Sequence, residues 1–234
     1  MTKYSAYLPL SRRGLLVGTA SLLVLSGCSG IIGPSSPPPQ IYVLQPEFRA
    51  LGNSPEVTWQ LAIGAPGASE SLDTARIALH RGETLDYFAD ARWTDATPIL
   101  IQEKLVEAFE KSTRIRAVAA TSDAVRADYV VESTIRDFQA NYETQDGTPT
   151  IVADIVVRIV RAERNDVVAT HDFHHEVRAA RNDVPSVVAA FDQAAGAVFE
   201  EIVDWTLHSA VAEKSMPDTP AASTPTNRKH KIAS

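Results

Sequence analysis

The stretch TIVADIVVRIVRA at residues 150–162 determines the class of fold. Apolar residues occupy both of its alternating faces: Ile151, Ile155 and Ile159 on one, and Val152, Val156 and Val160 on the other. A short segment that is apolar on both faces is typical of a strand buried inside a sheet. We therefore expect residues 150–162 to form a central strand with a neighbour on each side.

The flanking segments supply those neighbours. Residues 128–142 are extended in pattern and lead through the turn pair Asp146-Gly147 into the central strand, which is a strong hairpin signal. A second turn at Asn165-Asp166 leads into residues 167–179, where an apolar face alternates with a polar one. These three segments predict an antiparallel meander.

Two helices are predicted around this meander. Residues 97–112 carry an apolar stripe at helical spacing, with Thr97 as the expected N-cap and Pro98 at the first helical position. Asp183 and Pro185 are expected to open a longer helix, whose apolar residues keep a 3.6-residue period for about five turns.

Shorter strands are expected upstream, at residues 41–44, 57–63, 76–80 and 85–88. The order of strands and helices predicts an α+β fold, an α/β sandwich in which two helices pack on one face of a mixed, largely antiparallel sheet.

The N-terminus has the pattern of an export signal. Its first 27 residues contain no acid, and Lys3, Arg12 and Arg13 precede an apolar run at residues 15–25. At about 1.5 Å per helical residue this run is too short for a bilayer of roughly 30 Å. We expect residues 1–27 to be a signal peptide. Residues 11–16 also resemble a twin-arginine signal, so both export routes stay open.

The single cysteine follows this run directly. Leu25, Ser26 and Gly27 precede Cys28 and resemble the lipobox of bacterial lipoproteins. The resemblance implies that Cys28 is alkylated with diacylglycerol and then acylated, for example with palmitate, after cleavage. The alternative is an ordinary free or buried thiol. Ser29, rather than Asp, follows Cys28, and by the same resemblance this favours the outer membrane.

Composition divides the rest of the chain. Residues 28–40 are rich in proline and are expected to form a semi-rigid tether. Residues 41–212 carry the apolar periodicity of one domain, and residues 213–234 have the composition of a disordered tail with a basic end.

Neither composition nor motifs point to catalysis. The chain of 234 residues has a formal net charge of −7, which argues against nucleic-acid binding. It contains no nucleophile elbow, zinc-protease motif, Walker loop or dinucleotide fingerprint. We expect no enzymatic activity, no cofactor and no metal.

Three histidines cluster at residues 171–175. On a strand His171 and His175 lie about 13 Å apart, too far for one ion. His174 points to the opposite face, so we expect the polar edge of a sheet, with a pH-sensitive contact as the functional alternative.

Four segments together resemble a known family. They are Ile41 to Pro46 (IYVLQP), Leu72 to Ala78 (LDTARIA), Tyr87 to Trp93 (YFADARW) and the strand from Asp128 to Phe138. They are similar to the Y-x-L-x-P, L-D-x-x-R-I and Y-x-x-x-x-R-W segments and the following strand of the ABC-type transport auxiliary lipoproteins. The resemblance covers roughly residues 41–205.

The resemblance implies a function and partners. Members assist lipid movement between the inner and outer membranes, alongside an MCE-domain protein and the permease and ATPase of an ABC transporter. It thus implies a lipid-anchored component of the bacterial cell envelope that faces the periplasm. Phospholipid as a ligand and a homo-oligomer are left open. The alternative is a structural or assembly lipoprotein with no ABC transporter.

The motif residues are the candidate partner-binding site: Arg76, Tyr87, Phe88, Arg92 and Trp93. Arginine and tryptophan are common in the residues that dominate interface energies. The alternative is that Trp93 packs under the first helix while Arg76 or Arg92 pairs with a carboxylate such as that of Asp90.

Overall fold

The computed structural model describes residues 38–49, 51–123, 126–144 and 147–214. The predicted signal peptide, the lipobox with Cys28 and most of the predicted tether and tail lie outside these residues. None of the helices in the described ranges is both long enough and apolar enough to cross a membrane.

Within these described ranges, eight strands form one mixed sheet, accompanied by two α-helices and a short 3-10 turn at Thr121–Asp123. The strands are β1 (Gln40–Tyr42), β2 (Val57–Ile63), β3 (Arg76–Arg81), β4 (Thr84–Trp93), β5 (Ile115–Ala120), β6 (Tyr129–Tyr142), β7 (Thr150–Arg161) and β8 (Asp166–Arg178). The helices are α1 (Thr97–Ser112) and α2 (Val184–Lys214). This architecture confirms the predicted α+β class.

The predicted meander is the long part of the sheet. β7 pairs antiparallel with β6 on one side and with β8 on the other, as its two apolar faces indicate. The shorter strands join largely in parallel: β2 with β5 and β6, β3 with β6, and β1 with β4. Antiparallel pairing therefore dominates the meander, and parallel pairing dominates the rest.

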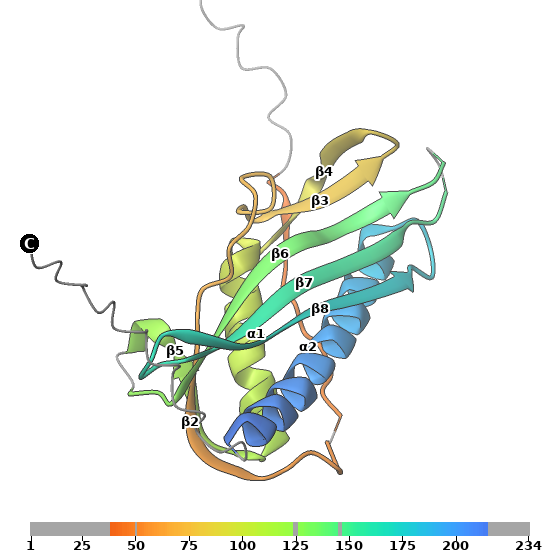
Figure 1. Cartoon of the computed structure of the whole chain (residues 1–234). Coiled ribbons are helices and arrows are strands. Elements are labelled where there is room, and N and C mark those ends of the chain that lie inside the picture. Colours follow the sequence, from red (N-terminus) through yellow and green to blue (C-terminus); the bar gives the residue numbers. More distant parts are fainter. Residues whose placement is uncertain (1–37, 50, 124–125, 145–146, 215–234) are drawn as a thin grey trace, which may run out of the picture. The chain divides into compact units, whose positions relative to one another are not determined.

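β6 connects the two halves of the sheet. One side of it follows β7, and the other side is shared between two smaller groups of strands. The first part of β6 pairs with β2, where Leu61 is opposite Tyr129, and the last part pairs with β3, where Leu79 is opposite Ala140. The order β1-β4-β3 thus extends from one end of β6 and β2-β5 from the other (Figure 1).

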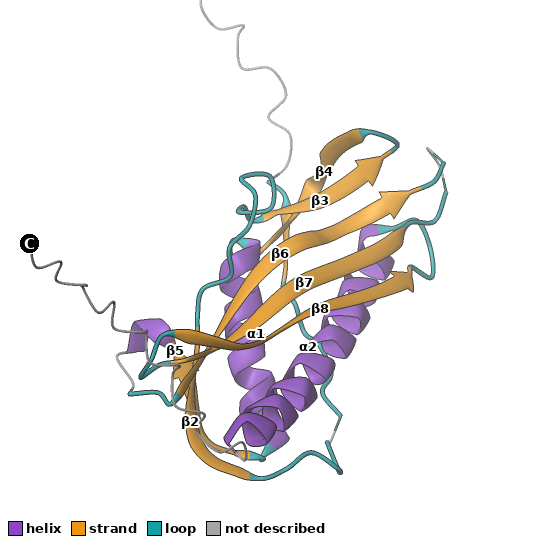
Figure 2. Ribbon diagram, viewed as in Figure 1, coloured by secondary structure: helices purple, strands orange, loops and turns teal. Residues whose placement is uncertain are grey.

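Both helices cover the same face of the sheet and leave the other face open (Figure 2). Trp93, Phe138 and Phe191 meet between the sheet and α2, with Trp93 and Phe191 edge to face at 5.3 Å between ring centroids. The predicted start of α2 is confirmed, because the Asp183 carboxylate accepts a hydrogen bond from the Ser186 backbone N–H at 2.8 Å.

Two details differ from the expectation. Ala96, not Thr97, is the N-cap of α1, and the Thr97 hydroxyl instead donates to the Thr74 carbonyl at 3.3 Å. β5 was not expected, because its sequence IRAVAA carries no alternation of apolar and polar residues. β5 is a strand because it pairs with β2, and this pairing cannot be read from the sequence of β5 itself.

A strap, residues 45–49 and 51–54, runs along α2. Acidic side chains of the helix accept its hydrogen bonds: Asp192 from the Gln45 backbone N–H, Glu200 from the Arg49 backbone N–H and Asp204 from the Ser54 hydroxyl. Gly196 of α2 faces the strap at Glu47. A Cβ atom added at Gly196 would lie 2.9 Å from the Glu47 carbonyl oxygen.

We predict that Gly196→Ala destabilises the protein by about 1–3 kcal/mol, since the added methyl group must push the strap away. This is opposite to the usual gain from replacing glycine by alanine within a helix. The measurement is the free energy of unfolding in urea. Gly52→Ala is the matched control, because a Cβ at Gly52 meets no atom within 4 Å. Equal stability of the two variants would contradict the close contact.

Candidate functional site

Arg76 and Arg92, two of the predicted motif residues, lie together on the open face of the sheet. Arg76 of β3 lies opposite Arg92 of β4, and Arg92 lies opposite Ile41 of β1. The neighbours of the two arginines along the chain, Ile77 and Trp93, are buried on the helix side. The two arginines and Ile41 are exposed and form one row across three adjacent strands.

The contacts of these arginines are aromatic and backbone contacts. The Arg76 guanidinium stacks on the Tyr87 ring at 3.6 Å from its centroid, and the Tyr87 hydroxyl donates to the Ser71 carbonyl at 3.0 Å. Arg92 Nε donates a long hydrogen bond of 3.4 Å to the Trp93 carbonyl. Within the described part of the chain no carboxylate, that of Asp90 included, forms an ion pair with Arg76 or Arg92.

A hollow of about 350 Å³ lies beside Arg76 and Arg92. Phe88 and the two arginines line it, together with small residues of β4 and Pro39, the residue before β1. We call Ile41, Arg76, Tyr87, Phe88 and Arg92 the arginine patch. It joins two cations to aromatic and apolar surface.

Trp93 does not belong to the arginine patch. Its side chain is 1% exposed and its ring packs on Phe191 of α2 and Phe138 of β6. This corrects the expectation that Trp93 contacts a partner, because a side chain so deeply buried offers no surface to one.

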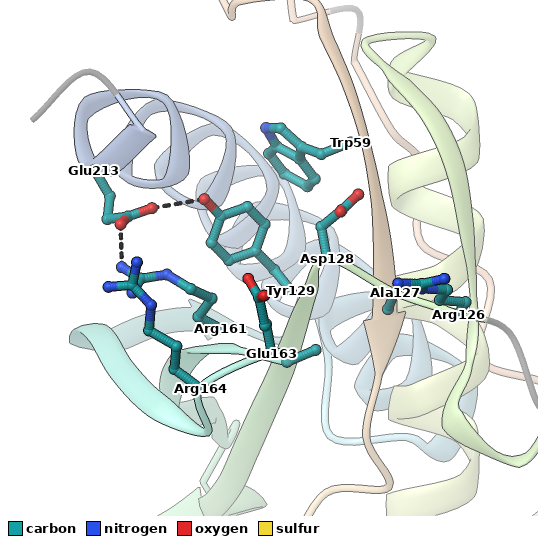
Figure 3. Close-up of a pocket in the computed structure, with 10 residues that line it drawn as sticks. Trp59, Arg126, Ala127, Asp128, Tyr129, Arg161, Glu163, Arg164 and Glu213 are labelled. Carbon is teal, nitrogen blue, oxygen red and sulfur yellow. Dashed lines mark hydrogen bonds and ion pairs between the residues drawn. The ribbon is translucent and has the colours of Figure 1, made fainter. Parts of the chain in front are cut away.

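A second hollow, of about 730 Å³, lies where α2 ends (Figure 3). At its wall the Tyr129 hydroxyl donates to Glu213 at 2.6 Å, and Glu213 also forms an ion pair with Arg161. Arg161 pairs in addition with Asp166 at 3.2 Å. Trp59 meets Tyr129 edge to face at 5.2 Å between ring centroids.

This second cluster acts as a structural clamp. Burial first and the hydrogen bond to Glu213 second raise the pKa of Tyr129, so its phenol stays protonated and donates to the carboxylate. The contacts tie the last turn of α2 to β6 and β7. Sequence reasoning missed the cluster, because its residues come from separate strands and the far end of the chain.

The three histidines make separate contacts. His174 lies on the open face between Asp154 at 3.2 Å and Glu176 at 3.3 Å. On the helix side His175 bonds to Glu201 at 2.9 Å, and His171 stacks on Trp205 at 5.7 Å between ring centroids. The prediction that His174 points away from the other two is confirmed.

Comparison with known proteins gives the family. The family model described as the ABC-type transport auxiliary lipoprotein component matches residues 42–203, from the end of β1 to the last third of α2. The chain belongs to this family. The matched range contains Arg76, Tyr87, Phe88 and Arg92 of the arginine patch and most of the described strands and helices.

Two similar proteins extend the comparison. The auxiliary lipoprotein is similar to an uncharacterized protein from Bradyrhizobium diazoefficiens, with 29% identity over 185 residues. These cover 79% of the auxiliary lipoprotein and 49% of that relative, so the chain spans about half the relative's length. A crystal structure of protein XCC0632 from Xanthomonas campestris aligns with a TM-score of 0.72 and 28% identity, covering 76% of this chain and 99% of the other.

We predict that Tyr129→Phe lowers the free energy of unfolding of the auxiliary lipoprotein by about 1–2 kcal/mol, since Glu213 loses its buried donor. The measurement is urea unfolding. Tyr87→Phe is the control, because its hydroxyl bonds a backbone carbonyl and no charged group. A larger loss for Tyr87→Phe would contradict the clamp.

We also predict that His174 titrates above the usual pKa of about 6.5. Its hydrogen bond to Asp154 is the largest cause, ahead of the one to Glu176. Because the folded pKa is raised, His174 stabilises the fold fully below about pH 6.5, and this stabilisation is lost as the pH rises through the folded pKa. NMR titration should show a larger fall of the His174 pKa in Asp154→Asn than in Glu176→Gln. The reverse order would contradict the geometry.

Proposed function

We propose that the protein is a lipid-anchored, non-catalytic auxiliary component of an ABC-type transport system that moves lipid between the two membranes of the cell envelope. Membership in the auxiliary lipoprotein family, over residues 42–203, is the observation that carries this proposal. Cys28 is the proposed anchor, and Ser29 after it favours the outer membrane, with the domain facing the periplasm.

The proposed role of the domain is to bind a protein of the same system. The arginine patch is the proposed contact surface, because its residues lie in the family segments and reach solvent on the face that the helices leave open. The proposed partners are the MCE-domain protein and the permease and ATPase of the transporter. No catalytic step is proposed.

The test is co-purification from solubilised membranes with the full chain as bait. We expect the MCE-domain protein or the permease to be enriched at least about tenfold over a bait that lacks the domain. Recovery of neither, with the bait correctly localised, would contradict the adaptor role and favour a structural lipoprotein of the envelope.

A second measurement tests the anchor separately. Cys28→Ala should abolish incorporation of labelled palmitate and leave an unprocessed precursor, because the thiol that carries the lipid is gone. Ser26→Ala keeps a small residue in the same segment and serves as the control. Palmitate labelling that persists in Cys28→Ala would contradict the anchor.

A further inference from the structure

The two arginines of the patch form an unusual pair. Arg76 and Arg92 stand directly opposite each other on neighbouring antiparallel strands, and like charges at such positions destabilise a sheet. The chain carries 29 acidic against 22 basic residues, so carboxylates to neutralise the pair are plentiful. No carboxylate in the described ranges pairs with either arginine. The two guanidinium groups therefore line the same hollow without a counter-charge.

Apolar surface surrounds this pair. Ile41 is 63% exposed and Val43 is 47% exposed, and both belong to the segment that begins the domain. Phe88 is half-buried and lines the same hollow as the two arginines. A ligand that fits this surface therefore carries an anionic group beside an apolar one.

The position of β1 favours a polypeptide as that ligand. β1 is the last strand on its side of the sheet, and β4 is its neighbour, so its other backbone edge is open within the described chain. An extended segment can lie along such an edge and present alternate side chains to the face of the sheet. The planar guanidinium groups match a carboxylate in shape as well as in charge.

We propose that the arginine patch binds an acidic segment of the partner protein, with a carboxylate held between Arg76 and Arg92 and a neighbouring apolar side chain on Ile41 and Phe88. The inference rests on the proposed function, because that function supplies the partner. It adds the chemistry by which the partner is recognised.

The experiment measures the affinity of the full chain, in detergent, for the purified periplasmic region of the MCE-domain protein from the same organism. Arg76→Gln and Arg92→Gln should each weaken binding at least about tenfold, as expected for loss of a charge-assisted hydrogen bond at an interface. Raising the salt concentration should weaken wild-type binding more than binding by these variants. Arg158→Gln is the matched control, since Arg158 is exposed on the same face of the sheet at β7.

A charge exchange makes the test specific. Arg92→Glu should abolish binding, and an Asp→Lys or Glu→Lys change in the partner segment should restore it, which a merely misfolded variant would not allow. If the wild-type chain binds the MCE-domain protein and both glutamine variants bind equally well, the inference is overturned while the proposed function stands.

Two other outcomes separate the remaining explanations. If the wild-type chain binds neither the MCE-domain protein nor the permease, the proposed function is contradicted. The inference then fails as well, because no partner protein is left to supply the acidic segment. If the glutamine variants instead lose binding to nanodiscs of phosphatidylglycerol and keep the protein partner, the patch holds a lipid phosphate and the inference is overturned.

Discussion

The pairing of β6 with its neighbours on both sides is the constraint on which the rest of the structure depends. β7 occupies one edge of β6 along nearly its whole length, whereas β2 and β3 share the other edge. The apolar residues of β6 on the helix side, such as Ile135 and Phe138, are buried beneath the helices. The two groups of strands share one edge of β6, so the loop between β2 and β3 runs along that edge. In this loop the Gly67 N–H donates to the Ser133 carbonyl of β6 at 2.9 Å.

This arrangement also places the arginine patch. β3 pairs with the last part of β6. β4 and then β1 continue the sheet from β3, on the side of β6 that faces away from β7. The inward residues Ile77 and Trp93 are fixed in the core, so Arg76 and Arg92 must point away from it. Burial of one face of these strands therefore determines which side chains remain available on the other.

Much of this could be predicted from the sequence, because the relevant signals are local. The two apolar faces of residues 150–162 indicated a central strand, and Asp183 indicated the start of α2. The opposition of Arg76 and Arg92 could not be predicted, because β3 and β4 pair with a register shift between Arg76 and Ala78. A bulge inserts residues on one strand only, so counting back from the turn gives the wrong partners. The clamp at Tyr129 and the strap on α2 escaped prediction for a related reason: both join residues far apart in the chain.

The strap has a mechanical consequence if the domain is attached through its N-terminus, as proposed above. Any pull transmitted from the residues before Gln40 first reaches β1, which is three residues long and is held by one parallel neighbour. Past β1 the load passes to the strap, whose bonds to Asp192, Glu200 and Asp204 are spread along three turns of α2. Because these bonds lie at successive turns of the helix, the strap is held at several points, whereas β1 is held along three residues. We therefore expect β1 to detach before the strap does, which would lengthen the connection while the helices and the meander keep their packing.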